Sequence, residues 1–323
     1  ADIIPILLPV SPLLPLTDIE VRDGIAYVTA DSSTAADPDF LVIDISDSKD
    51  ARMMSSLNTG PGLRSVSVAG SYAFAAAAST AAQLHVIRIA SPSSPALVKK
   101  YQLPLPAPTT TPAMGSSIFY DKGIIYLGTE KWNGNELQTI DVTDPADPKA
   151  LGGFDVGSKV NDIYMRNKLA YIASASQNQV QTLDVNDAAH PYVQNSFSPS
   201  GWERQEGETL SSFEDALTAG RTSGGFDIVA DPELFSWPPA SSSPLSLNIP
   251  GGVYGIVADR YHLYLATRNV DRELTILDRS IASSSAAYYS LPVAPQAMTC
   301  DGDTLYILAH NAPALYEINL HTK

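Results

Sequence analysis

The chain has 323 residues, of which 44% are hydrophobic and 17% charged, and its formal net charge is −15. This composition is typical of a globular protein and excludes a disordered chain. The acidic excess repels phosphate groups and anionic lipids, so we expect no nucleic-acid binding. No stretch reaches the roughly 18 apolar residues of a membrane span, so we expect no membrane insertion by this segment. The single cysteine, Cys300, excludes an intramolecular disulfide and a metal site built from several cysteines.

The chain begins with a short apolar run, "DIIPILLPVSP", which is followed by a phrase that recurs at intervals of 42 to 52 residues. A second apolar phrase follows each copy, and shorter apolar runs flank both. Because the runs are rich in β-branched and aromatic residues and are separated by Gly, Pro, Asp, Asn and Ser, they predict strands and turns. The residues at the centre of the first phrase are Tyr27, Phe74, Tyr126, Tyr171, Thr218, Tyr264 and Tyr306.

Four short strands in each repeat are typical of a β-propeller blade. We therefore predict an all-β fold, a single seven-bladed β-propeller domain over residues 1–323 with four-stranded antiparallel blades. The last repeat ends after its third strand, so we expect the N-terminal strand, within residues 1–16, to pair in the last blade and close the ring. The predicted blades span residues 17–62, 63–112, 113–159, 160–207, 208–252, 253–295 and 296–323.

Three repeats carry phrases with a recognisable pattern: "AYVTA…FLVIDISD", "IYLGT…LQTIDVTDPADP" and "AYIAS…VQTLDVNDAAHP". They resemble the repeats of the LVIVD family. Arg88 replaces the expected Asp in the second repeat, Asn319 replaces it in the seventh, and the fifth is degenerate. The resemblance implies a bacterial or archaeal β-propeller that is secreted or lies on the cell surface, and it implies no particular reaction.

Carboxylates recur at the end of the second phrase, at Asp44, Asp141, Asp184 and Asp278. They could form a ring of cation ligands, but each precedes a turn, where a carboxylate can accept backbone N–H groups. The turns also lack the ligand spacing of a calcium loop. We therefore expect these carboxylates to serve the turns, and we predict no metal site.

The first strand of each blade is expected to line a central tunnel. Its opening residues make a mixed polar ring with one cation, which could hold a small ligand or only water. The candidate tunnel-lining residues are Asp18, Arg64, Ser116, Asn161, Ser211, Tyr254 and Gln296.

One face of the propeller is expected to carry the long loops, both those between second and third strands and those between blades. Loops on a rigid scaffold are where binding groups are placed, and Trp and Arg are common interface anchors. The fifth repeat is the strongest local candidate, although simple drift of a degenerate blade would also explain it. The candidate binding residues are Trp132, Trp202, Arg204, Arg221, Asp227 and Trp237.

The motifs of zinc proteases, α/β-hydrolases and phosphate-binding loops are absent, so we predict no enzyme, no catalytic residue and no cofactor. We expect a non-enzymatic binding or structural module, extracellular or on the cell surface, with a protein or glycan partner and possible self-association. Two alternatives stay open. One is a filament or appendage subunit that inserts its N-terminal strand into a neighbouring copy. The other is a lyase or hydrolase with a site at the tunnel mouth.

Overall fold

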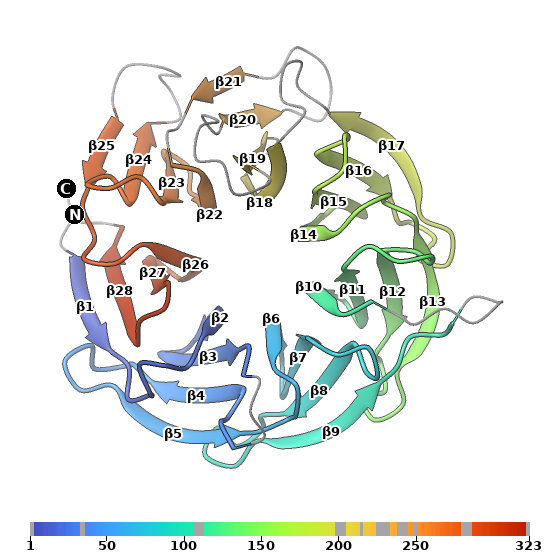
Figure 1. The fold of residues 1–323 in the computed structure, drawn as a ribbon, viewed down its shortest axis with the longest axis horizontal. Helices are drawn as coiled ribbons and strands as arrows, with labels where there is room; N and C mark the ends of the chain where they lie inside the picture. The colour runs from blue at the N-terminus through green and yellow to red at the C-terminus, as the bar shows by residue number, and fades with distance from the viewer. Residues whose placement is uncertain are drawn as a thin grey trace.

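The strands of the protein form seven four-stranded antiparallel sheets around a central axis in the computed structural model (Figure 1). Within the described part of the chain, no helix is long and apolar enough to cross a membrane. The structure describes residues 3–32, 36–105, 113–197, 205–213, 216–223, 233–237, 245–248, 251–278 and 286–320.

Each sheet except the last is built from four strands that are consecutive in the chain. The strands, in chain order, are β1 (Ile3–Leu7), β2 (Leu16–Arg22), β3 (Ile25–Ala30), β4 (Phe40–Asp44), β5 (Arg52–Leu57), β6 (Leu63–Ala69), β7 (Tyr72–Ala77), β8 (Leu84–Arg88), β9 (Ala96–Tyr101), β10 (Gly115–Asp121), β11 (Ile124–Thr129), β12 (Leu137–Asp141), β13 (Lys149–Phe154), β14 (Val160–Arg166), β15 (Leu169–Ser174), β16 (Val180–Asp184), β17 (Tyr192–Phe197), β18 (Gln205–Phe213), β19 (Ala216–Ser223), β20 (Glu233–Trp237), β21 (Leu245–Asn248), β22 (Val253–Ala258), β23 (His262–Thr267), β24 (Leu274–Asp278), β25 (Ala286–Tyr289), β26 (Pro295–Asp301), β27 (Thr304–Ala309) and β28 (Ala314–Asn319).

The last sheet is completed by the N-terminal strand, and its order is β1-β28-β27-β26. β1 runs antiparallel to β28, with Ile6 opposite Leu315, and the two strands lie side by side in Figure 1. This confirms that the N-terminal strand closes the ring. The strand pairs within its own chain, which is not the arrangement that the filament alternative requires.

Six of the seven sheets are regular blades, because their second strands share one burial pattern: a half-buried residue followed by five buried ones. The fifth sheet, β18–β21, is defined by its strand pairings, and most of its side chains lie outside the described set. The prediction of a seven-bladed propeller is therefore corrected to six regular blades and one irregular sheet. The physical reason is the degenerate fifth repeat, whose third strand leads into "PPASSSP" instead of the repeated Asp turn.

The hydrophobic core lies between neighbouring blades. Successive side chains of a strand point to opposite faces of its sheet. In β3, Val28 packs in a cluster with Leu315 of the last blade, whereas Tyr27 packs in a cluster with Leu63 of the second blade. Because both faces of the sheet are covered in this way, the second strands are apolar in nearly every position.

The repeated Asp at the end of the third strand serves the turn that follows it. Asp141 Oδ1 accepts hydrogen bonds from the Thr143 N–H at 2.9 Å and from the Thr143 hydroxyl at 2.7 Å. These two bonds hold the pKa of Asp141 below its usual value. The corresponding turn of the next blade reaches back to β12, where Thr139 Oγ1 donates to the carbonyl oxygen of Ala188 at 2.5 Å. The repeated phrase therefore shapes a turn that packs against the preceding blade.

Substitution of two neighbouring side chains of β1 tests its role in closing the ring. Ile6 is 1% exposed in the cluster shared by the first and last blades, whereas Leu7 is 76% exposed. Ile6→Ala should lower the free energy of unfolding by about 2–5 kcal/mol, because it leaves a cavity. The control Leu7→Ala should change it by less than about 0.5 kcal/mol. Urea denaturation measures both, and equal midpoints for the two variants would contradict a closing role for β1.

Candidate functional site: the central cavity

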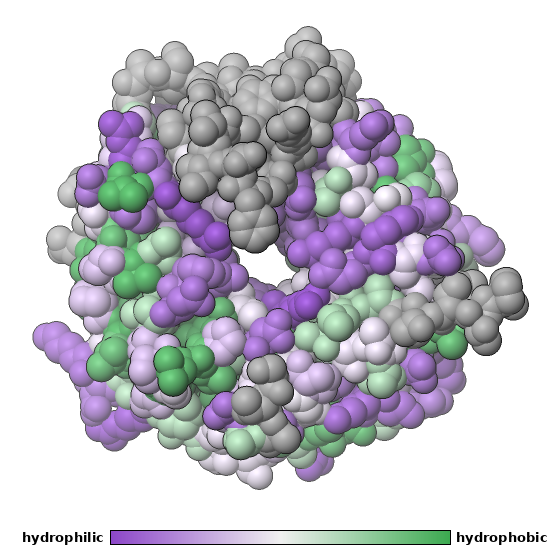
Figure 2. Space-filling view, viewed as in Figure 1, coloured by the Kyte–Doolittle hydropathy of each residue, from purple (hydrophilic) through white to green (hydrophobic). Residues whose placement is uncertain are grey.

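The innermost strands of the sheets enclose a cavity of about 760 Å³, and Figure 2 shows an opening at the centre of the molecule. Residues of β2, β6, β10, β14, β18, β22 and β26 line it, together with residues that follow the second strands. All seven residues singled out from the sequence lie on its wall: Asp18, Arg64, Ser116, Asn161, Ser211, Tyr254 and Gln296.

A register shift near the start of each innermost strand turns one residue of the strand toward the axis. In the second blade, Leu63 and Ser65 pair with consecutive residues of β7, so Arg64 is the extra residue, as in a β-bulge. The same shift occurs in all seven sheets. The extra residues are Thr17, Arg64, Ser116, Asn161, Glu208, Tyr254 and Gln296.

Two of these extra residues, Thr17 and Glu208, were missed by the sequence analysis, which selected Asp18 and Ser211 in their repeats. The sequence does hold a signal for them. Each extra residue comes ten positions before the central residue of its repeat, as Thr17 does before Tyr27 and Glu208 before Thr218. Counting ten positions back from the central residue of each repeat would have found both.

Several of these side chains bond to the innermost strand of the next sheet. Thr17 Oγ1 donates to the carbonyl oxygen of Leu63 at 2.8 Å. Ser116 Oγ donates to that of Val160 at 2.6 Å. Asn161 Nδ2 likewise donates to that of Gly207 at 2.7 Å. The polar ring therefore joins neighbouring blades besides lining the cavity.

Two half-buried carboxylates extend this set of contacts. Asp18 accepts hydrogen bonds from Ser65 Oγ at 2.8 Å and from the Val66 N–H at 2.9 Å. Asp162 occupies the equivalent position in the fourth blade and accepts a hydrogen bond from the Leu210 N–H at 2.8 Å. Burial raises the pKa of Asp162 to about 7, and the negative charge of Asp18 adds to this effect. The cavity thus holds a carboxyl group that titrates near neutral pH.

The end of the cavity beside the loops between second and third strands is rich in charged and aromatic groups. Arg64 forms an ion pair with Glu130 at 2.7 Å, and Asp31 lies 3.8 Å from the same guanidinium. On another side, the guanidinium of Arg268 lies 3.8 Å from the centroid of the Tyr254 ring. We call this end of the propeller the mouth face.

His310 and Arg268 both contact Gln296 at this end. His310 Nδ1 lies 2.5 Å from Gln296 Oε1, and Arg268 Nη2 donates to the same oxygen at 3.4 Å. Burial lowers the pKa of His310, and the nearby charge of Arg268 lowers it further. The mouth face therefore carries groups that can hydrogen-bond or stack with a ligand.

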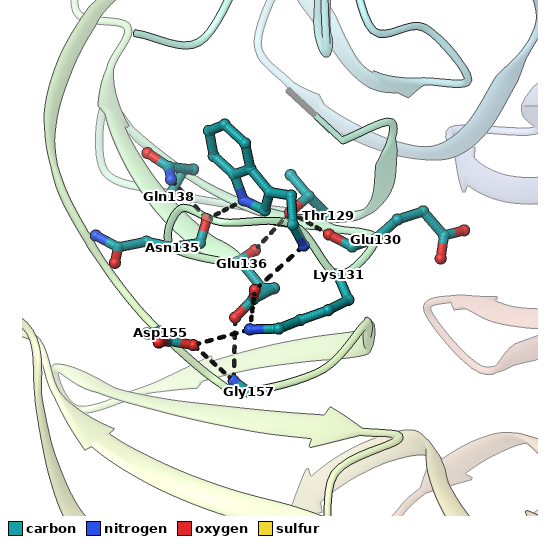
Figure 3. Close-up of polar contacts among 9 residues, drawn as sticks. Thr129, Glu130, Lys131, Asn135, Glu136, Gln138, Asp155 and Gly157 are labelled. Carbon is teal, nitrogen blue, oxygen red and sulfur yellow. Dashed lines mark hydrogen bonds and ion pairs between the residues drawn. The ribbon is translucent and has the colours of Figure 1, made fainter. Parts of the chain in front are cut away.

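The loop between β11 and β12 connects the mouth with the outer rim of the third blade (Figure 3). Glu130 reaches inward to Arg64, whereas Lys131 pairs with the fully buried Glu136 at 2.8 Å and with Asp155 at 3.3 Å. Glu136 also accepts a hydrogen bond from the Gly157 N–H at 3.0 Å. The loop is thus held at both ends by ion pairs.

Trp132 is the one candidate binding residue whose side chain is described. It is 8% exposed and lines a separate pocket of about 420 Å³, here called the rim pocket. Arg221 and Trp237 are described only by their strand pairing, opposite Gly207 and Leu217 respectively. The other three candidates, Trp202, Arg204 and Asp227, lie outside the described residues.

Cys300, the single cysteine, is exposed and lies on the cavity wall. Partial desolvation, together with the nearby charge of Asp301, raises the pKa of its thiol. A raised pKa disfavours the thiolate, which is the nucleophilic form.

The sheets and their central cavity define a β-propeller. Residues 63–102 match the family model described as LVIVD repeat, which confirms the resemblance to that family over the second blade. The matched segment is the repeat in which Arg88 replaces the expected Asp. A comparison with the sequences of curated proteins finds no match.

Several solved structures share the fold at low sequence identity. A virginiamycin B lyase from Staphylococcus aureus, solved with quinupristin, has a TM-score of 0.70 and 13% identity, with 99% of each chain covered. The extracellular domain of a putative hybrid two component system from B. thetaiotaomicron has a TM-score of 0.67 and 13% identity, covering 98% of this chain and 42% of that one. BamB from Moraxella catarrhalis has a TM-score of 0.58 and 13% identity, covering 94% and 85%. At this identity the likeness shows the fold alone.

The raised pKa of Asp162 predicts a pH dependence of stability. Its folded pKa, about 7, exceeds the usual value of 3.8 for an Asp side chain, so the folded state holds an extra proton between these values and stability falls as pH rises through this window. Between pH 5 and 8, wild type should lose about 2–3 kcal/mol more than Asp162→Asn, which cannot ionise.

Urea unfolding at several pH values measures this difference. Asp141→Asn is the matched control, because the pKa of Asp141 is lowered and its contribution is lost only as pH falls through that lowered pKa. Identical pH profiles for wild type and Asp162→Asn would contradict the prediction.

Proposed function

We propose that the chain is a non-enzymatic binding module of an extracytoplasmic protein, and that it uses the mouth face to hold a protein or glycan partner. The observation that carries this proposal is the difference between the two ends of the propeller. One end repeats a small set of turns, and the other end, where the structure describes it, carries different groups in different blades.

The end opposite the mouth is built from turns that serve the scaffold. The first hairpins of the first and third blades turn through Asp23-Gly24 and Lys122-Gly123, all with positive φ. The Asp turns after the third strands repeat the same carboxylate-to-amide bond, as at Asp44 and Asp141. Such repetition accounts for these residues without a ligand.

The mouth face varies from blade to blade. Arg64 and Glu130 form an ion pair on one side, Arg268 stacks on Tyr254 on another, and Gln296 lies between Arg268 and His310. Varied loops on a rigid scaffold are where proteins place binding groups. The placement of aromatic and Arg side chains at this end fits a recognition surface.

The polar atoms of the cavity support binding over catalysis. Asp18 and Asp162 both accept backbone N–H groups of the neighbouring blade, and the Arg64 guanidinium is paired with Glu130. These groups already have structural partners. An extracytoplasmic setting is supported by the LVIVD match and by the structural likeness to an extracellular domain.

A screen of small polar fragments by NMR chemical-shift perturbation tests the proposal. Fragments that bind should shift signals at the mouth face. Arg268→Ala should weaken the affinity of these fragments about tenfold, because it removes a charge that lies over Tyr254. Arg52→Ala is the matched control, because Arg52 is exposed on an outer strand, where it pairs with Asp50.

Two results would contradict the proposal. Perturbations confined to the opposite end would move the binding surface away from the mouth. Chemical conversion of a bound fragment by the wild-type protein would favour the lyase or hydrolase alternative, in which the Asp162 carboxyl would be the first group to test.

A further inference from the structure

The rim pocket is a second hollow of the mouth face, at the outer end of the loop between β11 and β12. The loop contributes Trp132, Asn133 and Asn135 to its wall, and β12 contributes Gln138. Leu151 comes from β13, and Asp155 directly follows that strand. Its volume of about 420 Å³ is within the range of small-ligand pockets. It does not share a lining residue with the central cavity.

The indole of Trp132 is fixed as a wall of this pocket. Its Nε1–H donates to the carbonyl oxygen of Asn135 at 2.9 Å, so the ring contributes apolar surface instead of a free donor. Gly134 packs directly on the ring: a Cβ built there would lie 2.4 Å from Cζ2 of the indole. Only a residue without a side chain allows this approach, and the ring position is therefore built into the loop.

The rest of the wall combines amides with apolar side chains. Asn133 is exposed, and Gln138 Nε2 donates to the carbonyl oxygen of Asn135 at 2.7 Å. Leu105 and Leu151 are 43% and 38% exposed at the same pocket. Amide groups can both donate and accept hydrogen bonds, which suits a ligand with hydroxyl groups.

The charges at the pocket are already balanced. Asp155 is the single charged side chain on its described wall. Its carboxylate pairs with Lys131 at 3.3 Å and accepts the Gly157 N–H at 3.0 Å. With no cation among the described lining residues, a phosphate or carboxylate ligand would lack its usual partner. A cationic ligand would find a carboxylate that is already paired.

We infer that the rim pocket binds a neutral pyranose sugar, either free or at the end of a glycan. A pyranose has apolar C–H faces and a rim of hydroxyl groups. Its C–H groups can pack on the electron-rich face of the indole, and its hydroxyls can pair with the amides of Asn133, Asn135 and Gln138. The inference rests on the proposed binding function, since it names a ligand class for one part of the mouth face.

The loop is prepared for such a ligand before binding. The buried Glu136 joins Lys131 to the Gly157 N–H, so the two sides of the pocket, from the loop and from the end of β13, are tied together. A preformed pocket lowers the ordering cost of binding. This matters for sugars because water competes for each of their hydroxyl groups.

Titration of the ¹⁵N-labelled protein with the methyl glycosides of glucose, galactose, mannose and N-acetylglucosamine tests the inference. At least one glycoside should produce a saturable shift of the Trp132 indole N–H signal. This signal is assigned by its absence from the spectrum of Trp132→Phe. Asn133→Ala should weaken binding, and Leu151→Arg, which places a long side chain in the pocket, should weaken it about tenfold or more. Both residues are exposed, so the thermal transition should stay unchanged.

Two further variants separate this inference from the proposed function. Gly134→Ala should weaken sugar binding by displacing the indole, whereas Arg268→Ala at the cavity should leave it unchanged. The absence of a saturable shift with all four glycosides, or full binding by Leu151→Arg, would overturn the inference. Fragment binding at the cavity in the same samples would then show that the proposed function stands without it.

Discussion

The ring depends on hydrogen bonds that side chains of several innermost strands make to the next sheet. The innermost strand lies at the edge of its sheet, with only one strand partner. Unpaired backbone groups at such an edge invite wrong pairing. In this protein Thr17, Ser116 and Asn161 donate to carbonyl groups of the following sheet, and Asp18 and Asp162 accept its N–H groups. The apolar clusters between blades add cohesion, but these polar contacts set the spacing around the axis.

This arrangement also determines the character of the cavity. The side chains that satisfy the strand edges must be polar and must face the axis, so the cavity is lined with hydroxyl, amide and carboxyl groups. Burying carboxylates there has an energetic cost, which appears as the raised pKa values of Asp18 and Asp162. A chemically varied cavity is therefore partly a consequence of closing the ring, and polarity alone does not identify a ligand.

The architecture was predictable because it follows from local patterns that repeat. Four-stranded antiparallel sheets are predicted by the strand periodicity and by the spacing of the central Tyr positions. Closure by β1 is predicted by the strand that is missing from the last repeat. The buried acid or amide before the third strand was not noticed, although it recurs: Asp39 bonds the Thr59 N–H, Gln83 the Leu103 N–H and Glu136 the Gly157 N–H. The rim pocket could not be predicted, because Asp155 meets Lys131 only after β12 and β13 have paired.

The irregular fifth sheet shows that the contacts at the axis and the contacts of the outer strands have different roles. Its sequence departs from the repeat in the outer strands, yet its innermost strand keeps the register shift, between Gly207 and Thr209. The fourth blade holds it by the same pair of contacts used elsewhere: Asn161 donates to Gly207, and Asp162 accepts the Leu210 N–H. Because the ring is defined at the axis, the outer strands and loops of a blade are free to vary without opening it. The same freedom explains how the third blade can carry the rim pocket while Glu130, in the same loop, still reaches Arg64 at the cavity.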